Sequence, residues 1–164
     1  MPNLELPGPT SLPDATVIRG RRIRGRGATC TVGGTPVGAD GALWQTSLCI
    51  ASYAPSGPDW GDGGPGPAQL AIALLLLVTD SNEAERFHPL FRDAVLAGIQ
   101  ADDWTLTLGD IRRWLGLVRI GIDPSNTIRR RNDAMILATQ SSVVDAAGTL
   151  AICLTGPEEL STMR

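Results

Sequence analysis

The hydrophobic pattern is strongest in the middle of the chain, where nine consecutive apolar residues run from Leu70 to Val78. Pro67 suits the start of a helix before this run, because its missing N–H would have no intrahelical partner there. The run is apolar on every side, which is typical of a helix buried in a protein core. The sequence therefore predicts a central core helix over Pro67–Val78.

A second helix is predicted directly after this run. Asp80 followed three residues later by Glu83 is a capping-box pattern, and apolar residues at helical spacing continue as far as Val95. Pro89 lies inside the pattern, and proline removes a backbone hydrogen bond from a helix interior. We therefore expect the helix to be kinked or split near His88.

Another capping box, formed by Thr107 and Asp110, predicts a third and shorter helix. We expect it to reach about Leu115 and to be closed by Gly116, because glycine is favoured just after a helix C-terminus. The pattern beyond it indicates a strand, a helix and a last strand, at residues 117–122, 123–139 and 149–154.

The first third of the chain has the pattern of β-structure. A strand is expected to begin at Thr16–Ile18, and another covers Ala28–Val32 before the turn signal Gly33-Gly34. Ala42–Tyr53 is predicted as a strand or a pair of short strands. The segment Ala54–Pro67 is rich in glycine and proline and is predicted to be a loop.

These elements predict an α+β fold, in which an N-terminal antiparallel sheet packs on the buried central helix and further helices surround it. The expected organisation has three parts. A Pro-rich arm covers residues 1–13, the α+β domain covers residues 14–116, and a C-terminal strand-helix-strand extension with a tail covers residues 117–164.

Composition excludes several kinds of chemistry. All 14 basic residues are arginine and none is lysine, so no Schiff-base lysine or phosphate-loop lysine exists in this chain. The formal net charge is −3, which argues against a protein that coats nucleic acid with its whole surface. Charge is uneven along the sequence, because residues 1–58 carry a net positive charge and residues 59–123 a net negative one.

The three cysteines, Cys30, Cys49 and Cys153, form no C-x-x-C pair and indicate neither a disulfide framework nor a zinc site. Cys49 and Cys153 lie between apolar neighbours and are expected to be buried. The first residues show no secretory signal pattern, and the run from Leu70 to Val78 is too short to cross a bilayer. We therefore expect a cytoplasmic protein of a bacterial or phage-infected cell, with no membrane association.

One stretch of sequence resembles a known family. Residues 60–71 read Trp-Gly-Asp-Gly-Gly-Pro-Gly-Pro-Ala-Gln-Leu-Ala. This string, with Phe87, Phe91, Val95 and the later Asp103-Trp104-Thr105-Leu106, resembles a small domain of unknown function found in bacterial phage, plasmid and other mobile-element proteins. That family often has an aromatic residue at the position of Asp62 and a serine at the position of Pro65. The resemblance covers about residues 53–115, and it implies a mobile-element setting and an α+β domain but no catalytic residue.

The densest cluster of positive charge consists of five arginines within eight residues: Arg19, Arg21, Arg22, Arg24 and Arg26. Such a cluster could grip a nucleic-acid backbone or dock on an acidic protein partner. The alternative is a solvated hairpin edge that charge protects from aggregation. On a strand, Arg19 and Arg21 would share one face with Ile23, and Arg22 and Arg24 would lie on the other.

The glycines before the core helix, Gly61, Gly63, Gly64 and Gly66, form a candidate anion or ligand loop, since helix N-termini attract anions. However, Pro65 and Pro67 lack N–H donors, and Asp59 and Asp62 would repel a phosphate. The alternative is a tight loop that lets the core helix begin beneath the sheet.

His88 is the only histidine, and any Ser–His–Asp, Cys–His or histidine–metal site would have to use it. Its place before Pro89, in a predicted helix, favours a structural or exposed histidine. The acidic pairs Asp102-Asp103 and Asp59/Asp62 lack the ligand spacing of a recognised cation site. We therefore expect no catalytic residue, no metal and no cofactor.

The leading functional hypothesis is a non-enzymatic accessory protein of a mobile element, which could act as a defence inhibitor. It would bind a host or mobile-element protein complex, or bind nucleic acid through the Arg19–Arg26 cluster. The first alternative is a binder of a small phosphate or nucleotide ligand, or an enzyme, that uses the glycine loop. The second is a structural virion component. The sequence leaves the oligomeric state open.

Overall fold

A computed structural model of the chain describes residues 11–23, 25–38 and 40–124. Several sequence predictions lie outside these described residues. They concern most of the Pro-rich arm, the side chain of Arg24, the helix and strand predicted after residue 124, and Cys153.

Four strands form one antiparallel sheet, in the order β3-β2-β1-β4. The strands are β1 (Val17–Ile23), β2 (Gly27–Val32), β3 (Thr35–Val37) and β4 (Asp103–Thr107). The predicted turn between β2 and β3 is confirmed, because Gly33 and Gly34 both adopt positive φ angles of 55° and 87°. Together with the helices this sheet confirms the α+β fold.

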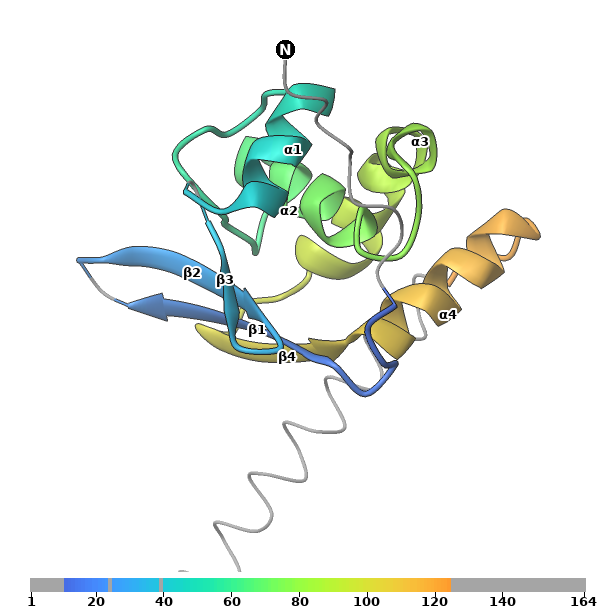
Figure 1. The fold of residues 1–164 in the computed structure, drawn as a ribbon, viewed down its shortest axis with the longest axis horizontal. Helices are drawn as coiled ribbons and strands as arrows, with labels where there is room; N and C mark the ends of the chain where they lie inside the picture. Colours follow the sequence, from blue (N-terminus) through green and yellow to red (C-terminus); the bar gives the residue numbers. More distant parts are fainter. Residues whose placement is uncertain (1–10, 24, 39, 125–164) are drawn as a thin grey trace, which may run out of the picture. The chain divides into compact units, whose positions relative to one another are not determined.

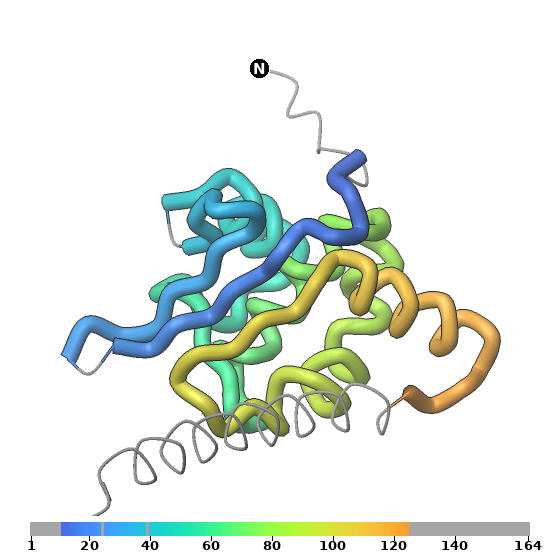
Figure 2. The backbone as a smooth tube through the Cα atoms, turned by 90° about the horizontal axis from the view of Figure 1, so that it is seen from below, coloured from blue at the N-terminus to red at the C-terminus, as the bar shows by residue number. Residues whose placement is uncertain are grey.

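Helices cover one face of the sheet (Figure 1). They are α1 (Ala42–Ile50), α2 (Pro65–Leu75) and α3 (Ser81–Phe91), while α4 (Leu108–Arg119) continues directly from β4. Seen from below, strands β1 and β4 lie in front of the helices (Figure 2). Within the described part of the chain, the sheet therefore has one covered face and one open face.

Helix α2 is the core helix that the sequence predicts, although it ends at Leu75, three residues before the expected Val78. Every residue from Pro67 to Leu75 is buried, and the helix packs on both α1 and α3. It begins at Pro65, two residues earlier than expected, because Gly64 takes the extended N-cap conformation. Both Pro65 and Pro67 then fall in the first turn, where a backbone N–H would have no intrahelical partner.

The strand predicted for Ala42–Tyr53 is wrong, because this segment forms helix α1. Its buried polar side chains suit a helix, since the Thr46 hydroxyl donates to the Ala42 carbonyl four residues back. The Ser47 hydroxyl likewise donates to the Trp44 carbonyl. The spacing of Trp44, Ser47 and Leu48 is helical, and the apolar character of the segment concealed it.

Helix α3 begins at the predicted cap, where the Asp80 carboxylate accepts a hydrogen bond from the backbone N–H of Glu83 at 3.0 Å. It is not split near His88. The α-helix passes through Pro89 to Phe91 and is followed by a single π-helical turn, η1 (Arg92–Leu96). Such turns often follow a disturbance of the regular hydrogen-bond ladder, which the proline supplies here.

Helix α4 has both halves of the predicted capping box, because the side chains of Thr107 and Asp110 each accept from the other's backbone N–H. It does not end at Leu115. The helix runs through Gly116 to Arg119, so the strand predicted for residues 117–122 is wrong. Gly121 closes the helix instead, with a φ of 77° that glycine adopts without strain.

The C-terminal turn of α4 is tied to the start of α3 by an ion pair. Arg119 Nε donates to Glu83 Oε1 at 3.0 Å, and the Thr79 hydroxyl also bonds to this carboxylate. The hydrogen bond from Arg119 is the main cause that lowers the pKa of Glu83 below its ordinary value of 4.5. A carboxylate with a lowered folded-state pKa stabilises the fold above its unfolded-state pKa, and this stability is lost as the pH falls through the folded value.

We therefore expect Glu83→Gln to reduce the free energy of unfolding by up to about 1 kcal/mol at neutral pH, the range of a partly exposed pair. The difference from the parent should shrink as the pH falls through the lowered pKa. Urea unfolding at several pH values measures it. The matched variant Glu85→Gln, at an exposed position on the same helix, should show no such pH-dependent difference. An equal effect of both variants would contradict the assignment.

Candidate functional site

Strand β1 divides the arginine cluster between the two faces of the sheet. The side chains of Arg19 and Arg21 lie on the open face and are 64% and 65% exposed. Arg22 lies on the covered face and is partly buried. This confirms the alternation expected from the sequence, and Ile23 shares the open face with Arg19 and Arg21. Arg26 is exposed in the turn that joins β1 to β2.

Threonines surround the two arginines on the open face. Arg19 pairs with Thr31 of β2 and with Thr105 of β4, and Arg21 pairs with Thr29 and Asp103. The carboxylate of Asp103 lies 3.9 Å from Arg19 Nε and 3.6 Å from Arg21 Nε. The result is a polar surface with two arginines, one aspartate and a row of hydroxyl groups, which we call the arginine face.

Arg22, in contrast, makes contacts inside the protein. Its Nη2 donates to Asp59 Oδ1 at 2.7 Å and to the Trp60 carbonyl at 2.8 Å. The guanidinium also lies 4.7 Å from the centroid of the Trp60 ring, within the range of a cation–π contact. The hydrogen bond to Asp59 is the main reason that the pKa of Arg22 is raised. Arg22 therefore anchors the glycine loop to the sheet and has little left to offer an external ligand.

The glycine loop is folded tightly against the rest of the domain. Gly61 has a φ of 91°, and its N–H donates to the Leu96 carbonyl at 3.0 Å. A Cβ at Gly61 would lie 2.9 Å from the Ile99 carbonyl oxygen, and one at Gly66 would lie 2.7 Å from Asp59 Cβ. The N–H of Gly64 donates to the Asp62 carboxylate at 2.7 Å. Close packing therefore accounts for three of the four glycines, whereas a Cβ at Gly63 would meet nothing.

The rest of the motif also has a structural role. Gln69 is fully buried in α2, where its carbonyl oxygen accepts from the backbone N–H of Tyr53 at 2.8 Å. Its amide nitrogen donates to the Ser47 hydroxyl at 2.8 Å. Trp60 is also buried, and its indole N–H donates to the Ala101 carbonyl. These bonds join α1, α2 and the segment before β4 around the glycine loop.

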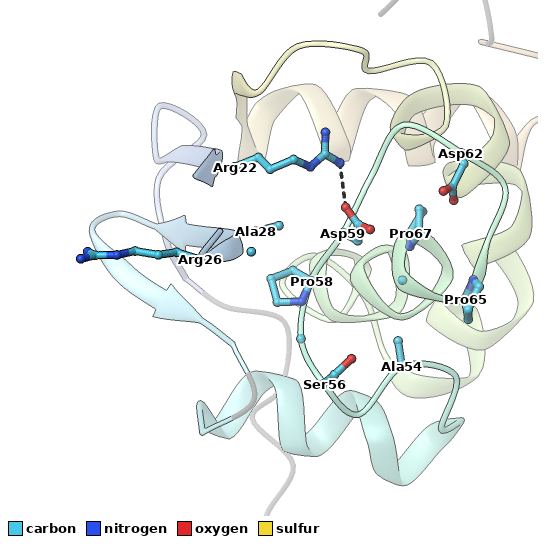
Figure 3. Close-up of a pocket in the computed structure, with 13 residues that line it drawn as sticks. Arg22, Arg26, Ala28, Ala54, Ser56, Pro58, Asp59, Asp62, Pro65 and Pro67 are labelled. Atoms are coloured by element: carbon cyan, nitrogen blue, oxygen red, sulfur yellow. Dashed lines mark hydrogen bonds and ion pairs between the residues drawn. The ribbon is translucent and has the colours of Figure 1, made fainter. Parts of the chain in front are cut away.

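Two pockets flank the N-terminus of α2. The first has a volume of about 500 Å³ and lies between the β1–β2 hairpin and the loop of residues 54–67. Figure 3 shows the Arg22–Asp59 pair at this pocket, with Arg26 pointing away from the pair. Its walls include Pro58, Pro65 and Pro67.

The second pocket, which we call the His88 pocket, has a volume of about 370 Å³. It is lined by residues of the loop after α1, of the α2 N-terminus, of α3 and of η1. These residues are Tyr53, Gly63, Gly64, Pro65, Ala68, His88, Pro89 and Arg92. Gly63 and Gly64 of the predicted glycine loop therefore line the His88 pocket, and Gly66 lines the first pocket.

The two described cysteines differ from each other. Cys30 is buried under the helices, and burial raises the pKa of its thiol to about 12. A thiol with such a pKa is protonated near neutral pH and is a poor nucleophile. Cys49 is exposed on α1, so the expectation that it is buried is wrong. It lies on the solvent side of helix α1.

The structure describes no group of three or more His, Cys, Asp or Glu side chains that could hold a metal ion. Among the same residues, no helix is long and apolar enough to cross a membrane.

Sequence reasoning did not identify Asp103 as a partner of the arginines or Tyr53 and Arg92 as pocket residues. The alternation of buried Trp104 and Leu106 with less buried residues could have revealed β4, and with it the place of Asp103. No signal in the sequence indicates that Tyr53 and Arg92 meet, because they are brought together only by the packing of α1, α2 and α3.

No curated protein and no solved structure is significantly similar to the chain. One family model matches residues 19–117. This range includes β1 from Arg19 onward, the other three strands, the glycine loop and most of α4. The match contains the region of the motif resemblance and extends it through β1 and β2. The chain belongs to the DUF6166 family, a family of unknown function.

Proposed function

We propose that this chain is a non-enzymatic accessory protein of a mobile element, which acts by docking its arginine face on an acidic surface of a protein partner. The observation that carries this proposal is the pair Arg19 and Arg21, about two-thirds exposed on a sheet face that no described helix covers. The covered face already supplies the core, so within the described residues the open face is left for a partner.

The composition of the arginine face favours a protein over nucleic acid as the binding partner. Asp103 lies between the two arginines and reduces the net charge of the three residues to +1. Single-stranded nucleic acid is usually held by stacking on aromatic side chains. Within the described residues, the outward positions of the sheet carry none, because Trp104 points into the core. Arginine and threonine side chains, by contrast, suit the polar rim and hydrogen bonds of a protein interface.

Charge supports an acidic partner. Arg19 and Arg21 keep unused N–H groups, because each meets Asp103 only through Nε at 3.6 Å or more. Arginine presents its N–H groups in a planar fork that matches a carboxylate. A partner with paired carboxylates could displace the weak internal contacts and order both side chains.

The test uses a photo-crosslinking amino acid at Thr29, an exposed position beside Arg21. In the bacterial host it should crosslink a defined protein, and Arg19→Ser/Arg21→Ser should weaken binding of that purified protein about tenfold. The matched control is Arg86→Ser/Arg113→Ser, which removes two other exposed arginines and should leave binding unchanged.

Two outcomes would overturn the proposal. Equal weakening by the control pair would show that net charge alone governs binding. A crosslink to nucleic acid would reassign the face, and in that case the Arg19→Ser/Arg21→Ser variant should flatten the dependence of log affinity on log salt by about 1.4–1.8. Melting curves for all variants confirm that the fold is intact.

A further inference from the structure

The His88 pocket brings together three polar side chains that docking of the arginine face does not use. Tyr53 comes from the loop after α1, His88 from α3 and Arg92 from the start of η1. The rings of Tyr53 and His88 lie with their centroids 5.4 Å apart. Gly63 and Gly64 at the N-terminus of α2 line the same pocket, where the helix dipole favours negative charge.

The hydrogen bonding of His88 fixes which of its nitrogens carries the proton. Its Nδ1 lies 2.6 Å from the carbonyl oxygen of Glu85, which can only accept, so Nδ1 must donate. That carbonyl would ordinarily accept from the backbone N–H of residue 89, which Pro89 lacks. In the neutral ring, Nε2 therefore holds the lone pair and acts as an acceptor.

This acceptor is the observation that points to a ligand. The His88 residue is only 6% exposed, yet its Nε2 has no hydrogen-bond partner in the described part of the chain. The atom is accessible to a ligand, because the sealed side-chain atoms without a partner among the described residues are the indole nitrogens of Trp44, Trp104 and Trp114. A ligand in the pocket that carries an O–H or N–H group would supply a partner for Nε2.

The other polar groups of the pocket suit an anion. Arg92 uses Nε and Nη2 on the Asp93 carboxylate, at 2.6 and 3.1 Å, which leaves Nη1 for a ligand. The Tyr53 hydroxyl makes no hydrogen bond with any described residue and can donate. Asp62 and Asp93 lie close by and reduce the positive charge. Charge alone would therefore give the pocket only a low affinity for an anion. A ligand that also donates a hydrogen bond to His88 should bind more tightly.

We propose that the His88 pocket binds inorganic phosphate. Its P–O⁻ oxygens accept from Arg92 Nη1 and the Tyr53 hydroxyl, and its P–OH donates to His88 Nε2. Pro65, Ala68 and Pro89 form apolar walls beside these groups. The volume of about 370 Å³ falls in the range of small-molecule sites. This site is independent of the arginine face.

The decisive measurement compares phosphate with sulfate by calorimetry and by NMR of the His88 ring. Near neutral pH most phosphate keeps a proton that it can donate, and sulfate has none. We expect phosphate to bind about tenfold more tightly or better, the value of one hydrogen bond to a charged group. Equal affinities for the two anions, or phosphate binding that leaves the His88 and Tyr53 signals unmoved, would overturn the proposal.

Matched variants separate the roles of the three side chains. His88→Asn keeps a donor for the Glu85 carbonyl but removes Nε2, so it should abolish the preference for phosphate over sulfate. Arg92→Gln should weaken both anions about tenfold or more. Arg86→Gln, which removes an exposed charge outside the pocket, should change neither. If Arg86→Gln weakens phosphate as much as Arg92→Gln does, general charge attraction explains the binding and the site is wrong.

One further variant and one further ligand complete the test. Should His88→Asn fail to fold, Tyr53→Phe alters a side chain that is 45% exposed and should weaken phosphate binding in a folded protein. No change in that variant would contradict the assigned donor. Phenyl phosphate is a further control, because a phosphate monoester has lost most of its P–OH protons near neutral pH and should bind more weakly than inorganic phosphate. Tighter binding of phenyl phosphate would contradict the hydrogen bond from P–OH to His88 Nε2.

Discussion

Leu74→Asp is expected to prevent the chain from folding. Leu74 lies in the last turn of α2, is fully buried, and belongs to a helix whose residues from Pro67 to Leu75 are all buried. An aspartate there would be an ionised group without a partner in an apolar core, which costs several kcal/mol. A domain of this size has about 5–15 kcal/mol of stability in total, and the lost packing of leucine adds about 2–5 kcal/mol to the cost.

Thermal melting followed by circular dichroism measures the effect, together with the soluble fraction on expression. Leu90→Asp is the matched control, because this leucine on α3 is 54% exposed and an aspartate there remains in water. The control should melt close to the parent. A soluble Leu74→Asp variant that melts cooperatively near the parent temperature would show that α2 is not the centre of the core.

The features that the sequence predicted best are those that local chemistry determines. The capping residues Asp80 and Thr107 mark helix starts because their side chains bond to nearby backbone N–H groups, whatever the rest of the fold does. The uninterrupted apolar run of α2 can be satisfied only by burial on all sides. The glycine pair at the β2–β3 turn likewise has a local cause, its two positive φ angles.

The wrong elements are those whose conformation depends on distant partners. Ser47 is tolerated on the buried face of helix α1 partly because Gln69 of α2 donates to its hydroxyl, and no pattern near Ser47 reveals that bond. Helix α4 continues past Gly116 because Val118 packs against the core and Arg119 pairs with Glu83 of α3. Tertiary contacts therefore override the local stop signal at Gly116.

The candidate site also has features with a local cause and features that depend on distant partners. Alternation along a strand was enough to separate Arg19 and Arg21 from Arg22, because it follows from backbone geometry alone. The contact of both exposed arginines with Asp103 required the pairing of β1 with β4, which is distant in the sequence. The contact of Arg22 with Asp59 required the packing of the glycine loop against β1. A cluster that looks like one basic patch in the sequence lies in two different structural environments in the fold.

Gly20→Ala is expected to destabilise the domain strongly, although glycine is an unfavourable residue for a strand interior. Gly20 faces Trp104 of β4 in the sheet register, and the indole ring packs directly on the glycine backbone. An added Cβ would lie 2.2 Å from both Cε2 and Nε1 of Trp104, far inside van der Waals contact. Trp104 is itself buried, so it can move only by disturbing its T-shaped contact with Trp60. Overpacking of this kind costs about 1–3 kcal/mol, and more where the neighbour is rigid.

Urea unfolding of a double-mutant cycle with Trp104→Leu tests the cause directly. If the clash with the indole is responsible, Gly20→Ala should cost much less in the Trp104→Leu background, with a coupling energy of about 0.5–3 kcal/mol. Gly116→Ala is the control, because a Cβ there would meet nothing within 4 Å and alanine favours the helix by up to about 1 kcal/mol. If Gly20→Ala costs the same with and without the tryptophan, the indole is not the obstacle, and the packing of Trp104 over β1 described above is wrong.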